Sequence, residues 1–349
     1  MIVQEARAVA REWVEQCGSL LTGFCGAFLS GSVLTAGEYE PWPETSDVDI
    51  VVITGAAEPY AKPGKFVYRS LLLEVTILTK SVFTALEYVL CTHYLAFALC
   101  KDSILADPEG WLGPLHLAVK SQYAQARWVR RRCSAFIRRI QDGVAGFDIR
   151  APFHEQVTSW VFPTGISTFP ILAAALQNCT VRKRYTAVRM VLETYGMMEF
   201  YSPLMGLLTG GGFRSGSLPG HLAELEKTFD LAAASQGPSA SYPYRGDISP
   251  ASKAIAIDGC GKLIASSYPM EAVFWMAVTF ARCHAILCMD VPEGDGERLP
   301  SFRAFMSDMG IDSPGGFESR NQHLLAFLPE VERIAEVIIQ KRATVPLYD

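Results

Sequence analysis

The stretch that decides the fold is residues 46–53, Ser-Asp-Val-Asp-Ile-Val-Val-Ile. Its β-branched residues predict a strand, which ends at Thr54-Gly55. Asp47 and Asp49 are two residues apart in this strand, so their side chains point to the same face of the sheet. Two carboxylates this close repel each other unless a cation lies between them, and oxygen ligands of this kind suit Mg²⁺. The stretch therefore predicts a strand that carries a metal-binding pair.

Two apolar segments near this strand also carry polar groups. Residues 24–29 predict a strand that meets Gly31-Ser32 at its end, and residues 71–78 predict a strand that contains Glu74. Glycine lets the backbone approach a ligand, and a serine hydroxyl with the free amides of a helix start can hold a phosphate. A carboxylate in an apolar strand is costly to bury unless it is paired or bound to metal. If the Glu74 strand lies beside the aspartate strand, three carboxylates converge on one spot.

The remaining N-terminal segments complete an α/β pattern. Helical spacing of apolar residues predicts an amphipathic helix over residues 2–17, and residues 66–68 predict a strand before a turn at Arg69-Ser70. A helix follows from about Ser81, and residues 103–106 predict a short edge strand.

Beyond about residue 112 the sequence predicts helices only. Helical periodicity covers residues 115–141, 154–162, 168–175, 181–194, 222–234, 270–289 and 322–341. We therefore predict an α+β fold of two domains. Residues 1–112 form an α/β lobe with a mixed sheet, and residues 113–349 form a larger all-helical lobe.

Acidic residues outnumber basic ones, 36 against 31, which gives the chain a net charge of −5. Because a protein that coats nucleic acid needs a basic surface, we expect no nucleic-acid partner. Residues 1–112 hold seven basic and 14 acidic residues, whereas residues 113–349 hold 24 and 22. An acidic lobe beside a mildly basic one suits a metal ion on one side and an anion bridging to the other.

The hydrophobic content of 50% requires a check for membrane spans. The uncharged residues 156–180 are interrupted by prolines, and the apolar residues 272–281 are followed by Arg282. Neither reaches the roughly 20 apolar residues that a span needs. The nine cysteines include no CxxC pair, which argues against a disulfide framework or a structural zinc site. We predict a soluble, cytoplasmic protein with free thiols.

Taken together, the motifs at residues 29–32 (LSGS), 46–50 (SDVDI) and 73–77 (LEVTI) resemble the DNA polymerase β-like nucleotidyltransferase superfamily. The last string is similar to one in streptomycin/spectinomycin (aminoglycoside) adenylyltransferases, and residues 104–110 look like the closing edge strand and turn of this domain. The resemblance covers about residues 20–112. The interval of 15 residues from Ser32 to Asp47 is slightly long for the family, and the intervening Pro-Trp-Pro loop can absorb the excess.

This resemblance implies a nucleotidyltransferase that moves a nucleoside monophosphate from an NTP to a hydroxyl of a small molecule and releases pyrophosphate. The acceptor would be antibiotic-like or another metabolite, and ATP is the expected nucleotide. Asp47 and Asp49 would hold the metal, two Mg²⁺ ions being expected, and Gly31 and Ser32 would hold the β- and γ-phosphates. Glu74 would be either a third metal ligand or the general base that takes the acceptor proton.

Further cations for the triphosphate are expected from the helical lobe, across a cleft between the two lobes. The best-placed group by helical context is Arg182, Lys183, Arg184 and Arg189, although a solvated basic face is the simpler explanation for them. Glu155, at a predicted helix start, is a possible acceptor-site residue, although the helix dipole alone favours a glutamate there.

Two other functions stay open. One is a protein-modifying or toxin–antitoxin-type nucleotidyltransferase, against which the large helical lobe argues. The other is a catalytically inactive nucleotide-sensing or scaffolding domain, against which the joint presence of Gly31, Ser32 and the three acids argues.

Overall fold

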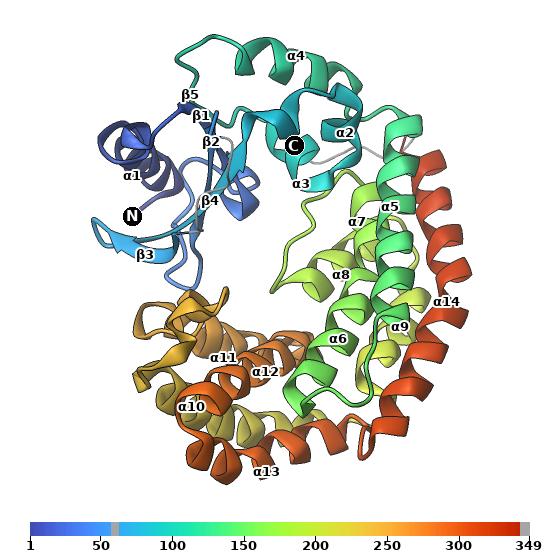
Figure 1. The fold of residues 1–349 in the computed structure, drawn as a ribbon. Helices are drawn as coiled ribbons and strands as arrows, with labels where there is room; N and C mark the ends of the chain where they lie inside the picture. Colours follow the sequence, from blue (N-terminus) through green and yellow to red (C-terminus); the bar gives the residue numbers. More distant parts are fainter. Residues whose placement is uncertain (57–62, 343–349) are drawn as a thin grey trace. The chain divides into compact units, whose positions relative to one another are not determined.

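The computed structural model describes residues 1–56 and 63–342 (Figure 1). These residues form two compact units. Unit 1 consists of Met1–Arg132 with Asn178–Thr180, and unit 2 consists of Cys133–Gln177 with Val181–Asp349. The chain passes from one unit to the other within a helix. The domain boundary that the sequence places at residue 112 stays a prediction.

Unit 1 contains a five-stranded mixed sheet within the described residues. Its strands are β1 (Phe24–Ser30), β2 (Val48–Thr54), β3 (Gly64–Tyr68), β4 (Leu71–Thr79) and β5 (Ile104–Ala106). Their order is β3-β4-β2-β1-β5, with β2 and β4 parallel and the other neighbours antiparallel. The predicted α/β sheet region, its mixed character and its short edge strand are confirmed.

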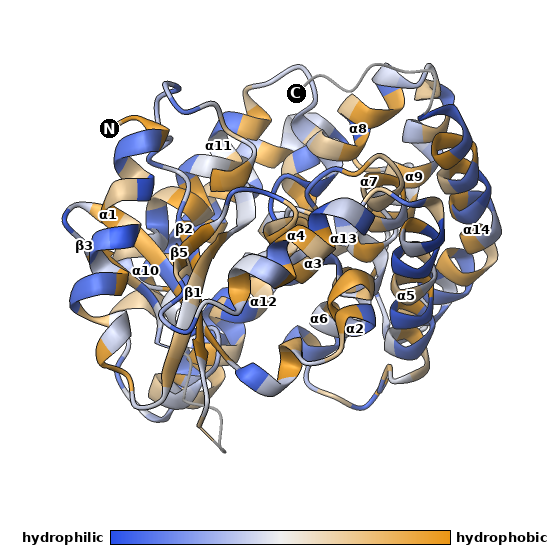
Figure 2. Ribbon diagram, turned by 90° about the horizontal axis from the view of Figure 1, so that it is seen from above, coloured by the Kyte–Doolittle hydropathy of each residue, from blue (hydrophilic) through white to orange (hydrophobic). Residues whose placement is uncertain are grey.

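Helix α1 (Val3–Gln16) covers one face of this sheet. Its buried stripe includes Val3, Ala6, Ala10 and Trp13, and the Trp13 ring lies 5.6 Å from that of Phe66 on β3. In the pleat, this face also carries the fully buried alternate residues of β2 and β4, and Figure 2 shows the hydrophobic character of the central strands. The acidic residues of β2 and β4 therefore lie on the opposite face.

The β3–β4 hairpin turns at the predicted position. Arg69 and Ser70 have φ angles of +45° and +65°, as a tight two-residue hairpin turn requires. Arg69 forms an ion pair with Glu12 on α1, and the Tyr68 hydroxyl donates a hydrogen bond to Gln16 at 2.8 Å. Helix α1 thus supports a turn that lacks the usual glycine.

Unit 1 is completed by short helices that follow β4 and β5 in the chain. They are η3 (Lys80–Phe83), α2 (Leu86–Cys91), α3 (His93–Leu99), α4 (Leu112–Gln122) and the first part of α5 (Ala126–Ala145). The prediction of one helix over 115–141 is wrong, because the chain breaks between α4 and α5 at Tyr123. There the buried Arg132 donates hydrogen bonds to the carbonyls of Tyr123 (2.6 Å) and Leu90 (2.9 Å).

The described residues of unit 2 form helices joined by loops and no strand. After the end of α5 it contains α6 (Phe153–Ile166), α7 (Phe169–Ala174), α8 (Arg184–Thr194), α9 (Tyr201–Thr209), α10 (Leu218–Ala234), α11 (Gly259–Ile264), α12 (Val273–Asp290), α13 (Pro292–Asp308) and α14 (Pro314–Lys341). Residues 273–287 of α12 are all buried, and this helix packs against α6, α10 and α13. The predicted helical remainder is confirmed, and α9, α11 and α13 are additional to the prediction.

Two helical segments are long and apolar enough to cross a membrane by length and composition, so the expectation that neither apolar stretch reaches the length of a span is wrong. They are Phe153–Ala174 and Pro269–Asp290, and 83% and 89% of their most apolar windows are buried inside the protein. Core helices of soluble proteins pass the same test. The cytoplasmic location stays a prediction.

Candidate metal centre

A polar row crosses four neighbouring strands of the sheet in unit 1. Lys65 on β3 pairs in register with Glu74 on β4, which pairs with Asp49 on β2, which pairs with Ser30 on β1. Because residues paired in register point to the same face, all four side chains lie on the face opposite α1. Asp47, two residues before Asp49, directly precedes β2 and lies beside this row, in contact with Lys65.

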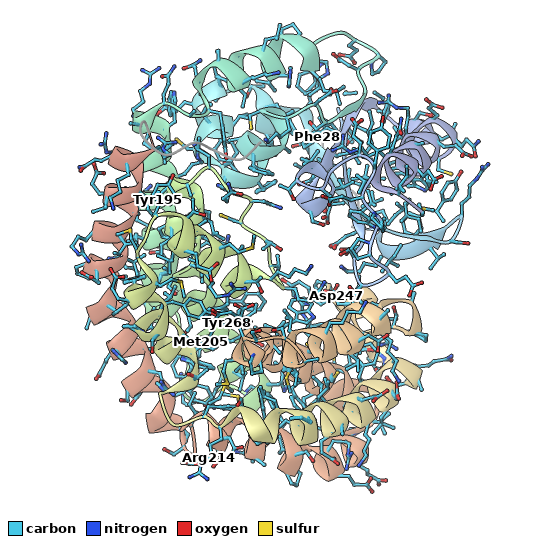
Figure 3. All side chains as sticks on the ribbon, turned by 180° about the vertical axis from the view of Figure 1, so that it is seen from behind. Phe28, Tyr195, Met205, Arg214, Asp247 and Tyr268 are labelled. Carbon is cyan, nitrogen blue, oxygen red and sulfur yellow. The ribbon has the colours of Figure 1, made fainter. Side chains whose placement is uncertain are left out.

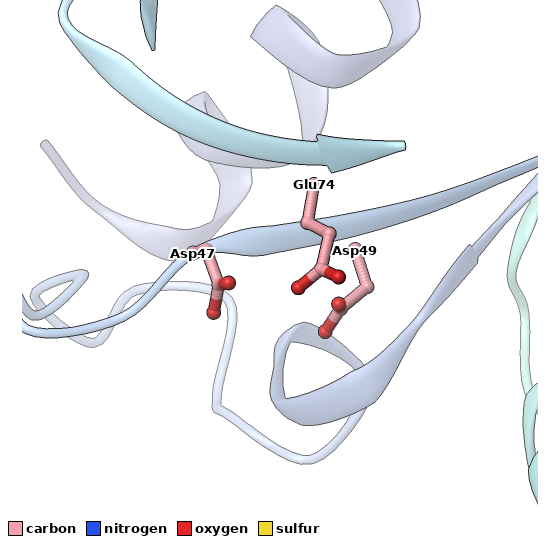
Figure 4. Close-up of side chains that lie close together, drawn as sticks. All are labelled: Asp47, Asp49 and Glu74. Carbon is pink, nitrogen blue, oxygen red and sulfur yellow. The ribbon is translucent and has the colours of Figure 1, made fainter. Parts of the chain in front are cut away.

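The structure brings the three predicted carboxylates together. Asp47, Asp49 and Glu74 each offer an oxygen, and these atoms lie within 4.8 Å of one another (Figure 4). All three residues are half-buried, so the group is confined but reachable from solvent. Among the described residues, this is the one group of three or more acidic, histidine or cysteine side chains with such spacing.

Lys65 is the main site residue that the sequence analysis missed. Its ammonium contacts the Asp47 carboxylate and lies 2.8 Å from Oε2 of Glu74. The lysine side chain is only 10% exposed. An available signal was the turn at Arg69-Ser70, since a two-residue turn fixes the hairpin register and places Lys65 opposite Glu74.

Burial and ion pairing shift the pKa of Asp47 in opposite directions. Burial raises the pKa of Asp47, and the negative charge of Glu74 raises it further, whereas the Lys65 ammonium lowers it. The net direction is upward, so the Asp47 carboxylate is destabilised as an anion despite its lysine partner. A divalent cation would relieve this cost.

Gly31 closes the group from the side of β1. It has a φ of +71°, and a Cβ atom built on it would lie 1.9 Å from Oδ2 of Asp49. Only glycine permits this approach of the backbone to a carboxylate. Gly31 begins the single 3₁₀ turn η2 (Gly31–Leu34), in which the Ser32 carbonyl accepts hydrogen bonds from the amide and hydroxyl of Thr35 at 3.1 and 2.9 Å.

The loop between Ser32 and Asp47 is held by the start of α1. The amide of Val3 donates to the carbonyl of Glu40 at 3.0 Å, and the amide of Trp42 donates to that of Met1 at 2.9 Å. These backbone hydrogen bonds fix the extra residues of a loop that is slightly long for the resembled family.

Two of the predicted phosphate-binding arginines have other partners within unit 2. Arg184 is 2% exposed, donates from Nε to the Val181 carbonyl at 2.8 Å and lies 3.8 Å from the Phe274 ring centroid. Arg189 donates to the buried Glu271 at 2.7 Å and lies over Tyr268, which Figure 3 labels. These contacts hold both guanidinium groups within unit 2.

Removing the Arg189 charge should therefore destabilise unit 2. Arg189→Met leaves the Glu271 carboxylate buried without its cation, and we expect the free energy of unfolding to fall by about 3 kcal/mol. Urea denaturation measures this change. Arg333→Met, which removes the exposed partner of Glu330, is the control and should leave the unfolding midpoint in place. Equal midpoints in the two variants would contradict a structural role for Arg189.

The other predicted residues of unit 2 lie at or near the starts of α8 and α6. Lys183 directly precedes α8, and burial together with the charges of Arg182 and Lys262 lowers its pKa. Glu155 lies in the first turn of α6, exposed, with its carboxylate 3.9 Å from Nε2 of His154. The roles proposed for the residues of unit 2 stay predictions, namely those of Arg182, Lys183, Arg184, Arg189 and Glu155.

Comparison with family models and curated proteins identifies no relative of this chain. No family model matches the chain, and no curated protein matches its sequence. The resemblance to polymerase β-like nucleotidyltransferases therefore rests on the quoted sequence motifs alone and stays a prediction.

Proposed function

We propose that the chain is a Mg²⁺-dependent nucleotidyltransferase that moves a nucleoside monophosphate from an NTP, with ATP expected, to a hydroxyl of a small molecule. The observation that carries this proposal is the convergence of Asp47, Asp49 and Glu74 beside a glycine whose backbone abuts the Asp49 carboxylate. A solvated acidic strand end needs neither the third acid from another strand nor the glycine.

The residues present fit a magnesium ion. The donors are carboxylate oxygens only, which Mg²⁺ prefers over nitrogen or sulfur, and the half-buried group leaves room for waters and phosphate oxygens. Asp47 and Asp49 would hold the ion, with Glu74 as a further donor. When bound, Mg²⁺ would neutralise the charge that develops on the transferred phosphoryl group and on the leaving pyrophosphate.

The chain's own groups would position the reactants. In the proposed reaction the acceptor oxygen bonds to the α-phosphorus, the bond from that phosphorus to the bridging oxygen breaks, and pyrophosphate leaves with the electron pair. The acceptor proton goes to a base, for which Glu74 is the candidate if it is not a metal ligand. Ser32 and the amides of η2 would hold the β- and γ-phosphates.

The decisive experiment starts from the full chain and the four common NTPs. Thermal-shift screening with Mg²⁺ identifies the nucleotide, and pyrophosphate release with a panel of polyhydroxylated amines then identifies an acceptor. We expect one NTP to raise the melting temperature only in the presence of Mg²⁺. If no NTP shifts the melting temperature and no acceptor supports pyrophosphate release, the proposal is wrong.

Removing the Ser32 hydroxyl should weaken nucleotide binding. Ser32→Ala removes one hydrogen bond to a charged phosphate, which is worth about 1–2 kcal/mol, or about a tenfold increase in Kd. Isothermal titration with the NTP identified above measures this change. Ser121→Ala, at an exposed serine on α4, is the control and should bind like the wild type. An unchanged Kd for Ser32→Ala would place the phosphates elsewhere.

A second candidate function is a nucleotide-sensing domain without turnover. The contact of Lys65 with Asp47 and Glu74 favours it, because an ammonium already compensates part of the acidic charge. This function predicts tight NTP binding with no pyrophosphate release for any acceptor. The screen described above separates the two functions.

A further inference from the structure

The polar row on the sheet contains its own cation. The three carboxylates of Asp47, Asp49 and Glu74 carry three negative charges, and Lys65 supplies one positive charge in direct contact with two of them. The formal charges of these four side chains alone sum to two negative units, which a single divalent cation would balance.

The backbone holds Lys65 in this position. Its register opposite Glu74 is set by the hairpin, which is tied to α1 through the Arg69–Glu12 ion pair. The Lys65 side chain is 10% exposed, less than those of its partners Asp47 (18%) and Glu74 (21%). The Lys65 ammonium is thus held within the carboxylate group and is not a solvated surface charge.

We propose that Lys65 takes the place of a second metal ion, so that the centre binds one divalent cation through Asp47 and Asp49 instead of two. The inference rests on the proposed function and deepens it. A second divalent ion bound between Asp47 and Glu74 would lie against the Lys65 ammonium. Like charges in a half-buried site repel strongly, because little water screens them. Lys65 therefore fixes the number of metal ions.

The stoichiometry of Mn²⁺ binding tests this inference without any measurement of activity. Titration of the full chain with Mn²⁺, with free Mn²⁺ followed by electron paramagnetic resonance, should give about one ion per chain for the wild type. Lys65→Met removes the positive charge of the Lys65 ammonium. This variant should bind about two ions per chain, and a folded variant that still binds only one ion, however tightly, would contradict the inference.

Two further variants control for charge and folding. Lys65→Arg keeps the positive charge and should keep the wild-type stoichiometry. Lys80→Met removes a lysine that pairs with Glu109 outside the group, and it should also bind like the wild type. If Lys65→Met does not fold, Lys65→Gln provides the same loss of charge with a polar side chain. Circular dichroism verifies that each variant is folded.

The outcomes separate this inference from the function on which it rests. Two Mn²⁺ ions per wild-type chain, or identical titrations for the wild type and the folded neutral variant, would overturn the role of Lys65 and leave the nucleotidyltransferase proposal standing. A wild-type chain that binds no Mn²⁺ would overturn both.

Discussion

Asp47→Asn and Asp49→Asn should each abolish nucleotidyl transfer while unit 1 stays folded. An amide has nearly the shape of a carboxylate but no charge, so each variant removes a metal-holding group with little change in packing. Loss of metal-assisted charge stabilisation is worth several kcal/mol, and we expect pyrophosphate release to fall at least about 1,000-fold. Pyrophosphate release with the nucleotide and acceptor found by screening measures the effect.

The two variants should differ in stability without metal. Asp49→Asn relieves repulsion among the three carboxylates, so its melting temperature should equal or exceed that of the wild type. Asp47→Asn also removes a partner of Lys65 and should gain less. Differential scanning calorimetry in a chelator compares them.

Asp102→Asn is the matched control for the loss of one acidic charge. Asp102 is exposed and lies outside the row, and its variant should keep full activity and the wild-type melting temperature. Activity retained in both Asp47→Asn and Asp49→Asn would remove the basis of the proposed function.

Much of unit 1 was predictable because its determinants are local. Alternation and β-branching predict β2 and β4, and the turn at Arg69-Ser70 sits between two apolar runs. The parallel pairing of β2 with β4 brings Asp49 beside Glu74, and the sequence could state this only as a condition. The position of Lys65 opposite Glu74 was predictable from the turn register. It was missed because the predicted strand, residues 66–68, is shorter than β3 and does not include Lys65.

The surroundings of the basic residues in unit 2 were not predictable, because they depend on distant residues. Arg189 pairs with Glu271, 82 positions along the chain, and Arg184 stacks on Phe274. Sequence periodicity places both arginines on a helix but does not reveal which face is buried. Helix α13 was missed for another reason: Pro292, Gly294 and Pro300 are typical of loops.

Gly31→Ala should abolish activity nearly as completely as loss of an aspartate, although residue 31 carries no chemical group. The new methyl group would lie 1.9 Å from Oδ2 of Asp49, which is far inside contact distance, so the carboxylate must rotate away. Misplacing a catalytic group by about 1 Å can cost about 100-fold in rate, and we expect at least that loss. Pyrophosphate release measures it, and Mn²⁺ titration should show weaker metal binding.

A matched glycine separates this steric effect from backbone strain. Gly110 has a φ of +69°, close to that of Gly31, but a Cβ atom there would meet no heavy atom within 4 Å. Gly110→Ala should therefore cost about 1–2 kcal/mol of stability from the left-handed conformation alone and leave activity unchanged. The difference between the two variants measures the overlap with Asp49.

A double variant completes the argument for Gly31. In Gly31→Ala/Asp49→Ala the carboxylate that the methyl group displaces is gone, so the stability lost in Gly31→Ala beyond that of Gly110→Ala should return. Activity should not return, because the metal-holding carboxylate is absent. If the single Gly31→Ala variant kept both full activity and full metal affinity, neither property would depend on the position of the Asp49 carboxylate beside Gly31. Gly31 would then be needed only for the turn into η2. The proposed metal centre would rest on the convergence of the three carboxylates alone.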